Sequence, residues 1–496
     1  MKKWLPLLMV AVMLVSLVPS AMAEGETGYY KGMDFSKHVS IEYMGWSNNG
    51  LDGTDSVFKK IEELFNMDLT YTSVPNGEYQ NFSSMRLASG DVPTMFKAMV
   101  PNTAGLNIYR QFQDDGLIIN YSEYIDKYGF DNLKAVLEQP WAQQLKEDDG
   151  FYQFPNKVGP GMHAIFYRKD WADKLGLALP KDYNEFKDFL KAIVAADPDG
   201  NGTTGITAVG ILGLEYIISA FTGKSGTYVN VDGKWVHKSQ APGFIDGIKY
   251  LKDLYSEGLL DPEFAMMSNT TIQEKMSSGR TATLLLNGTA PWWKGMETPL
   301  LAYKPEAELS AFGYWPAGPA GEVRQGGANF FGTVLISSEA SEDEIVRALA
   351  FMDWTLTDEC YDLFYWGIEG EQYNVVNGER VLNNEAKQAI TFGRDLYLFY
   401  DLINNVSQYK ALTIQPLIDN KEWLATHVVF DEVVGLSTDV TVEIGSAIDD
   451  VYSTWMVDFI TGAKDIDTQW DAYLAELEAA GLSRYLVEVE NYMATK

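Results

Sequence analysis

In this sequence, aromatic side chains stand beside amide and charged side chains in segments that follow strand-like stretches. A sugar ring presents an apolar face of C–H groups and a rim of hydroxyls, so a site for it needs aromatic platforms and planar polar groups. The residue types and their positions therefore predict a site for a carbohydrate. Its candidate ligand-binding residues are Trp46, Asn48, Asn49, Lys97, Asn102, Arg168, Glu215, Tyr216, Trp292, Trp293, Trp366, Glu369 and Tyr373.

Several of these candidates have a structural alternative. Trp46 follows a strand-like stretch, and it either meets a ligand or caps the edge of a sheet. Trp292 and Trp293 follow the stretch TATLLL; neighbours in an extended segment point to opposite sides, so only one of them is expected to face the site. Arg168 either reaches the ligand or forms a salt bridge within its own domain.

The stretch YWGIEGEQY places a carboxylate and aromatic rings around two glycines. Gly367 and Gly370 permit backbone angles closed to other residues, which a crossing between two domains could use. Trp366 and Tyr373 offer ring faces to a ligand. Glu369 either accepts hydrogen bonds from sugar hydroxyls or fixes the turn by accepting bonds from backbone N–H groups.

Motifs of catalysis do not occur in the sequence. The four histidines are far apart, and neither HExxH nor GxSxG is present. With 69 acidic residues, a plausible pair of carboxylates is no specific sign of a glycoside hydrolase. We therefore expect a binding protein and not an enzyme, with a secreted glycoside hydrolase as the less favoured alternative. A peptide ligand is a further alternative, but loops rich in tryptophan and amides favour an oligosaccharide.

Residues 1–23 have the features of a secretory signal peptide, with a basic start, an apolar core and a small-x-small ending at Ala21 and Ala23. No later run of 18 apolar residues follows, so we expect a soluble mature chain. Cys360 is the only cysteine, which excludes an internal disulfide and leaves no residue for a lipid anchor at the mature N-terminus. These features predict export to the periplasm or the cell exterior, and the missing anchor favours the periplasm.

Charge and length set two further bounds. Without the signal peptide the chain has 69 acidic and 36 basic residues, a net charge of −33. Such a surface repels nucleic acid and anionic membranes, so we expect neither as a partner. The remaining 473 residues exceed a single core and predict two or three domains.

Strand-like and helix-like stretches alternate along the chain, which is typical of an α/β protein with parallel sheets. Gly/Pro-rich stretches at 155–161 and 314–327 predict crossings between two lobes. We expect each lobe to be a mainly parallel sheet flanked by helices, with the ligand between the lobes at the loops that follow the strands. The predicted division is 24–158 plus 327–372 for lobe 1, and 159–326 plus 373–496 for lobe 2.

Seven segments, spread in order from residue 87 to residue 486, resemble the sugar-binding family of extracellular solute-binding proteins of ABC transporters. That family includes maltose- and alginate-oligosaccharide-binding proteins. The segments are LASGDVPTMF, FYRKDWADKLGLALPKDYNEFKDFLKAI, DPDGNG, YLKDLYSEGLLDPEF, KMSSGRTATLLLNG, WGIEGEQY and FITGAKDIDTQWDAYLAELEAAGLSRYL. One departure is Thr94, where the family often has an acidic residue.

The resemblance implies the two-lobed periplasmic-binding-protein fold and transport-linked binding. It implies that an oligosaccharide is captured by hinge closure and delivered by a monomer to the permease subunits of an ABC transporter. Relatives have a sugar-stacking tryptophan where Trp292 and Trp293 stand, and a carboxylate and an aromatic ring where Glu215 and Tyr216 stand. No cofactor is implied.

Some relatives bind calcium at the segment DPDGNG. Asp197, Asp199 and Asn201 occupy the first, third and fifth positions of a calcium loop. The ninth and twelfth positions are Gly205 and Ala208, so the closing carboxylates are missing. The segment is therefore either an ordinary Asx/Gly turn or a structural calcium site.

Overall fold

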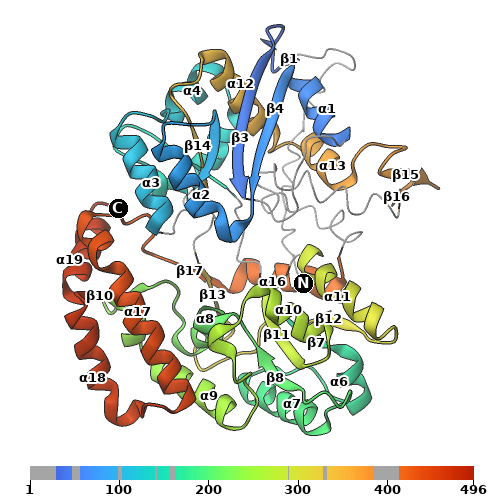
Figure 1. The fold of residues 1–496 in the computed structure, drawn as a ribbon, viewed down its shortest axis with the longest axis vertical. Coiled ribbons are helices and arrows are strands. Elements are labelled where there is room, and N and C mark those ends of the chain that lie inside the picture. The colour runs from blue at the N-terminus through green and yellow to red at the C-terminus, as the bar shows by residue number, and fades with distance from the viewer. Residues whose placement is uncertain are drawn as a thin grey trace, which may run out of the picture.

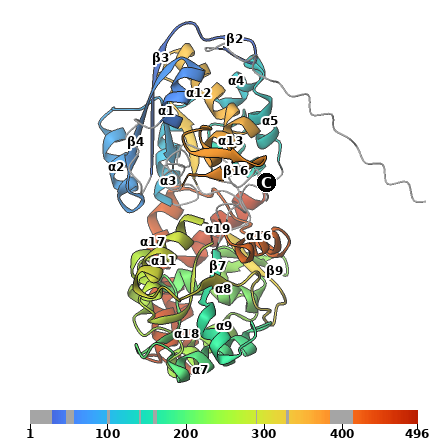
Figure 2. The ribbon, with the colours of Figure 1, turned by 90° about the vertical axis from the view of Figure 1, so that its right-hand side faces the viewer.

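The chain folds into two lobes joined by several crossings (Figure 1). The structure is a computed structural model, and the residues that it describes are 29–46, 56–98, 103–139, 142–156, 163–288, 290–327, 332–383 and 413–496. Seen from the side, the lobes are stacked along the long axis of the molecule (Figure 2). The predicted α/β class with two lobes is confirmed.

Lobe 1 is built on a five-stranded sheet with the order β4-β3-β5-β14-β6. Its strands are β3 (Val39–Trp46), β4 (Met67–Val74), β5 (Met95–Ala98), β6 (Phe154–Pro155) and β14 (Thr333–Ile336). Its helices are α1 (Ser56–Phe65), α2 (Asn76–Ala88), α3 (Thr103–Asp114), α4 (Tyr121–Tyr128), α5 (Asp131–Leu137), η1 (Ala142–Leu145), α12 (Glu342–Trp354) and α13 (Asp358–Trp366). Two hairpins lie at its margin, β1 (Tyr29–Tyr30) with β2 (Met33–Asp34), and β15 (Tyr373–Val376) with β16 (Glu379–Leu382).

Lobe 2 is built on a four-stranded sheet with the order β12-β7-β11-β8. Its strands are β7 (His163–Arg168), β8 (Thr204–Thr207), β11 (Thr281–Asn287) and β12 (Leu309–Ala311). The strands β9 (Tyr228–Val231) and β10 (Lys234–His237) form a separate hairpin. Its helices are α6 (Lys169–Leu175), α7 (Tyr183–Ala196), α8 (Gly210–Thr222), η2 (Lys238–Gln240), α9 (Phe244–Ser256), η3 (Phe264–Met266), α10 (Asn269–Ser277), α11 (Ala290–Tyr303), α16 (Gln415–His427), α17 (Asp439–Thr461), α18 (Ile466–Ala479) and α19 (Leu482–Met493). A parallel pair joins β13 (Arg324–Gly327) to β17 (Val428–Phe430).

Both large sheets are mixed, and the crossings explain why. In each sheet one strand runs against the others: β14 in lobe 1 and β7 in lobe 2. These are the strands by which the chain enters each lobe from the other one. The remaining strands of each sheet share one direction, as the expected parallel arrangement requires. Since β6 leads out of lobe 1 toward lobe 2, the carboxyl ends of β3, β4 and β5 face lobe 2.

Burial and capping show why these segments form. Along β3 the side chains alternate between buried and exposed at first and are then all buried, because helices cover both faces of the sheet. Helix α12 begins with a capping box between Ser341 and Glu344. Helix α7 begins at Asp182, whose side chain accepts bonds from the N–H groups of Asn184 and Glu185.

Separate hydrophobic cores stabilise the lobes. The first unites residues from 30–154 and 334–366 with Val434, and Tyr373 and Leu382 pack against it. The second and third lie in lobe 2, and the third packs beneath α11. The predicted residue boundaries of the lobes stay a prediction, although the packing of Tyr373 favours a first lobe that extends beyond 372.

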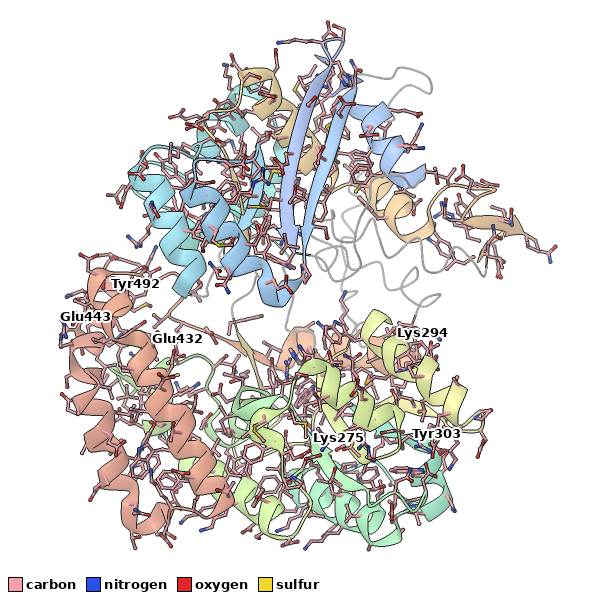
Figure 3. The ribbon with its side chains drawn as sticks, viewed as in Figure 1. Lys275, Lys294, Tyr303, Glu432, Glu443 and Tyr492 are labelled. Carbon is pink, nitrogen blue, oxygen red and sulfur yellow. The ribbon has the colours of Figure 1, made fainter. Side chains whose placement is uncertain are left out.

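The C-terminal part of the chain lies at the level where the lobes meet. Both ribbon views place α16 and the end of α19 there. The Tyr492 hydroxyl, on α19 (Figure 3), donates to the Val434 carbonyl at 2.6 Å, and the Lys496 Nζ donates to the Gln144 carbonyl of lobe 1 at 3.3 Å. In the part of the chain that the structure describes, no helix has the length and apolarity to cross a membrane.

Candidate functional site

The edge of lobe 1 that faces lobe 2 holds a lysine among aromatic rings. The Lys97 side chain on β5 is 1% exposed, and its Nζ lies 5.1 Å from the ring centre of Trp46 and 5.3 Å from that of Tyr43. It also donates to the Tyr71 hydroxyl at 3.3 Å. Cation–π attraction stabilises an ammonium in such a cage. Trp46 and Lys97, two sequence candidates, are thus brought together, and both are buried.

Trp46 is held in place from several sides. Its ring packs edge-on against Tyr79 at 5.2 Å, and its backbone carbonyl accepts a bond from the Tyr71 hydroxyl at 3.2 Å. A Cβ at Gly332 would lie 2.5 Å from the Trp46 ring, so the backbone just before β14 approaches the ring as closely as only glycine permits. Nearby, Asn156 is fully buried, and neither polar atom of its side chain has a hydrogen-bond partner in the described part of the chain.

The facing edge of lobe 2 holds an arginine among aromatic rings. Arg324 lies on β13, and its guanidinium carbon is 4.4 Å from the ring centre of Tyr216 and 4.8 Å from that of Trp315. The Tyr216 hydroxyl lies 3.4 Å from Nε2 of His163, the first residue of β7. Asn420 of α16 donates to the His163 carbonyl at 3.1 Å, and its own Oδ1 has no partner among the residues that the structure describes.

The charge of Arg324 is not balanced by these neighbours. Among the described residues, none of its guanidinium nitrogens has a hydrogen-bond partner, and the residue is 1% exposed. Burial lowers the pKa of Arg324 to about 10, although the phenols of Tyr216 and Tyr183 favour the charged form. Burial and the Arg324 charge lower the pKa of His163 to about 3, so His163 is neutral at pH 7.

Glu215 lies beside Tyr216 on α8, inside a helix, and its carboxylate accepts from Lys238 Nζ at 2.5 Å. The pair borders a small cavity of about 20 Å³, enough for about one water molecule. Asp431, which is distant in sequence, accepts a hydrogen bond from the Ser225 hydroxyl at 2.5 Å, and burial raises the pKa of the Asp431 carboxyl. The structure therefore gives Glu215 an internal ion pair, while Tyr216 contacts Arg324.

Trp292 and Trp293 lie in the first turn of α11, so the expectation of an extended segment is wrong. On a helix, two successive side chains do not point to opposite sides, so both can contact the same core. Trp293 is buried in the third core, with Lys294 Nζ 4.1 Å from its ring centre. Trp292 is half-buried against the same core. Figure 3 shows Lys294 at the end of α11 nearer lobe 1 and Tyr303 at the far end.

The glycine-flanked stretch lies between α13 and the hairpin of β15 and β16. Gly367 and Gly370 both have positive φ, as predicted. Trp366 is buried, its ring centre is 6.0 Å from that of Tyr373, and the guanidinium of Arg380 lies over both rings. Glu369 is exposed. Contact of Trp366, Glu369 or Tyr373 with a ligand stays a prediction.

Arg168 forms internal ion pairs, as its structural alternative predicts. It is fully buried and donates to Asp170 at 2.7 Å and to Asp199 at 3.1 Å. Lys304 also donates to Asp199. Burial by itself would raise the pKa of Asp199. The hydrogen bonds and charges of Lys304 and Arg168 outweigh burial, so the pKa is lowered overall and the carboxylate stays charged. Arg168 therefore has carboxylate partners within lobe 2, and its contact with a ligand stays a prediction.

The predicted calcium loop is held by the same contacts. Asp197 accepts bonds from the backbone N–H groups of Asn201, Gly202 and Thr203, so its carboxylate closes the loop from within the protein. Lys304 and Arg168 supply positive charge at Asp199, so these residues do not fit a calcium ion well. Among the described residues, no group of three or more His, Cys, Asp or Glu side chains could hold a metal ion.

Three candidates, Asn48, Asn49 and Asn102, lie outside the described residues. Sequence reasoning missed Arg324, Trp315 and His163. All three stand in or beside the Gly/Pro-rich stretches predicted as crossings, and a charged residue in such a stretch was the available signal.

Comparison with known proteins decides the family. Residues 51–359 match the family described as "Bacterial extracellular solute-binding protein". The chain belongs to this family. Solute-binding proteins bind and do not transform their ligands, so the expectation that the chain is no enzyme is confirmed.

Similar proteins are known from several bacteria. The polygalacturonan/rhamnogalacturonan-binding protein YtcQ of Bacillus subtilis is 24% identical, over 98% of this chain and 98% of its own. The fructooligosaccharide ABC transporter substrate-binding protein FusA of Streptococcus pneumoniae is 24% identical, over 88% of this chain and 86% of its own. Lipoprotein LipO of Bacillus subtilis is 23% identical, over 94% and 93%.

Solved structures share the fold. The alginate-binding protein AlgQ2 without calcium ion matches with a TM-score of 0.69 at 20% identity, over 92% of this chain and 98% of that chain. FusA of S. pneumoniae in complex with kestose matches with a TM-score of 0.64 at 20% identity, over 92% and 100%. At such identities the likeness shows the fold alone.

Proposed function

We propose that this solute-binding protein captures an oligosaccharide between its lobes by hinge closure and delivers it to the permease of an ABC transporter. The observation that supports this proposal best is the pair of facing edges, each with a cation among aromatic rings. Lys97 lies with Trp46 and Tyr43 on lobe 1, and Arg324 lies with Tyr216 on lobe 2. Rings and donors of this kind suit the faces and hydroxyls of sugars.

The names of relatives support the same ligand class. YtcQ, FusA and AlgQ2 are named for binding polygalacturonan, fructooligosaccharide and alginate. Closure requires that the ligand bind the closed arrangement better than the open one. The crossings at β6–β7 and β13–β14 join the lobes, and a rotation about them would bring the two edges together.

A thermal-shift panel of the mature protein tests the ligand class. Neutral oligosaccharides, acidic oligosaccharides and short peptides are added separately, and a ligand of the native state raises the melting temperature by mass action. Stabilisation by a saccharide supports the proposal. Stabilisation by peptides alone would overturn it in favour of the peptide alternative, and hydrolysis of the saccharide during the assay would revive the glycoside hydrolase.

Trp292→Ala tests the tryptophan platform more cleanly than Trp293→Ala does. Trp293 is 6% exposed, and its loss opens a cavity in the third core. Trp292 is only half-buried, so its replacement is expected to weaken saccharide binding with a smaller loss of stability. Equal saccharide affinity of Trp292→Ala and wild type would remove Trp292 from the site.

The proposed place of work is outside the cytoplasm, after removal of residues 1–23. The proposed form is a monomer. One relative is named a lipoprotein, so lipid attachment is measured together with cleavage. Mass spectrometry of the exported protein measures both, and an unprocessed N-terminus would contradict this part of the proposal.

A further inference from the structure

Arg324 is a buried cation without a counterion. A guanidinium carries five N–H donors and stays charged at pH 7. In the described part of the chain, all three nitrogens of Arg324 lack a hydrogen-bond partner. A buried charge is costly unless it is paired and hydrogen-bonded, so a native protein rarely retains one without a purpose.

The neighbours of Arg324 orient it without neutralising it. Tyr216 and Trp315 pack on the guanidinium. The groups that influence its charge are the phenols of Tyr216 and Tyr183, and the adjacent His163 is neutral. The two rings lie 5.8 Å apart and tilted to each other, so they contact the guanidinium from two neighbouring directions and hold it in place without accepting its N–H groups. Such a fixed fork matches the two oxygens of a carboxylate.

The position of Arg324 connects it to the site between the lobes. It begins β13, which leads directly into the crossing to lobe 1, and His163 stands where the chain enters lobe 2. Arg324 is 1% exposed in this structure, so a ligand can reach the guanidinium only after the residues packed around it move. Because Arg324 lies next to a crossing between the lobes, a rotation of the lobes would change the packing around it.

We propose that Arg324 is the counterion for a carboxylate of an acidic oligosaccharide, so that the ligand class is uronic-acid-containing saccharides. This inference rests on the proposed function. A guanidinium without a counterion among the described residues is stabilised by an anion, and among sugars the uronates have a planar carboxylate. The strongly acidic protein surface repels long polyanions, so a short ligand whose charge meets a buried cation fits better than a long polymer.

Calorimetric titration with trigalacturonate and with its methyl ester tests the proposal. The two probes share their rings and hydroxyls and differ in charge. The wild type is expected to bind the acid about 10-fold or more tightly than the ester, as a hydrogen-bonded charge pair implies. Arg324→Met is expected to lose that preference and to retain binding of the ester.

Arg280→Met is the matched control, because Arg280 is an exposed arginine of the same lobe. It removes the same charge and is expected to keep the preference for the acid. Preference lost equally in both variants would show a general charge effect and overturn the role of Arg324. The same holds if Arg324→Met keeps the full preference.

The failure of this inference differs from failure of the proposed function. If the wild type binds only neutral saccharides, the inference fails and the proposed function stands. If no saccharide binds, both fail. A second readout needs no ligand: the melting temperature of Arg324→Met is expected to equal or exceed that of the wild type. A large drop would show that the guanidinium is satisfied inside the protein and would overturn the inference.

Discussion

Arg168 and Arg324 are both buried arginines of lobe 2, yet their surroundings are opposite. Arg168 stacks on Trp171 and pairs with Asp170 and Asp199. Arg324 stacks on Tyr216 and Trp315 and pairs with no carboxylate among the described residues. The aromatic support is shared, and only the counterions differ.

The difference separates a structural cation from a functional one. Around Arg168 the protein has supplied every charge that the interior requires, including Lys304 beside Asp199. Around Arg324 it has supplied rings and a neutral histidine and left the anion to be brought from outside. Burial alone therefore does not identify a binding residue; a buried charge without a partner among the described residues needs an explanation, and for Arg324 we propose a ligand.

The largest effect is expected when the paired arginine is removed. Arg168→Met leaves Asp170 without its bidentate partner and Asp199 with Lys304 alone. Breaking a buried ion pair from one side costs about 3–5 kcal/mol of unfolding free energy. Urea denaturation measures the loss, and exposed Arg280→Met serves as the control. A loss as small as that of the control would mean that the ion pairs around Arg168 do not stabilise the lobe.

Removal of the unpaired arginine is expected to cost little or to stabilise. Arg324→Met replaces an unbalanced charge by an apolar side chain of similar length, and the unfolding free energy should stay within about 1 kcal/mol of wild type or rise. Arg347→Met is a contrasting control in lobe 1, because the Arg347 guanidinium donates to the carbonyls of Phe65, Asn66 and Lys37. It should destabilise by about 1–3 kcal/mol. A reversed order of the two variants would contradict the comparison.

Acid is expected to affect the two arginine sites in different pH ranges. His163 has a folded pKa of about 3 and an unfolded value of 6.5, so unfolding binds a proton and its stability contribution is lost as the pH falls from 6.5 toward 3. Asp199 has a folded pKa below 3.8, so its contribution is lost only as the pH falls below that value.

Replacing His163 by glutamine isolates the first of these effects. Relative to wild type, His163→Gln should lose less stability between pH 6.5 and pH 4, where Asp199 stays charged. Denaturant midpoints across this range provide the measurement. An unchanged pH slope would show that His163 titrates normally, and the neutral neighbour of Arg324 would then be in doubt.

The smallest effect is expected from calcium. Lys304 and Arg168 already bond the carboxylate of Asp199, so millimolar calcium should leave the melting temperature of the wild type unchanged. Asp199→Asn is the control for the loop. A calcium-dependent rise that Asp199→Asn abolishes would establish the structural calcium site that the sequence left open.

Much of the fold could be predicted from local sequence patterns. The expected alternation of strand and helix is seen where β3 is followed by α1 and then β4, and the crossings fall at the Gly/Pro-rich stretches. These features depend on short-range periodicity and on turn residues. The reversed direction of β7 and β14 could not be predicted, because it depends on which strand enters a lobe from the other.

The site was harder to predict because it depends on tertiary pairing. Trp46 and Lys97 were candidates and do lie together, whereas Glu215 and Arg168 turned out to hold internal ion pairs. Trp293 lies in a hydrophobic core because the segment is not an extended loop: helix α11 already begins at Ala290. The sequence signal for Arg324 was only its place in a Gly/Pro-rich stretch, since its lack of a counterion among the described residues exists only once the chain is folded.

A crystal structure of the mature protein with bound trigalacturonate tests the central claim most directly. The account predicts the saccharide between the lobes, with a carboxylate within hydrogen-bonding distance of the Arg324 guanidinium and rings packed on aromatic side chains of the facing edges. A saccharide bound elsewhere, or Arg324 paired with a carboxylate of the protein itself, would contradict it.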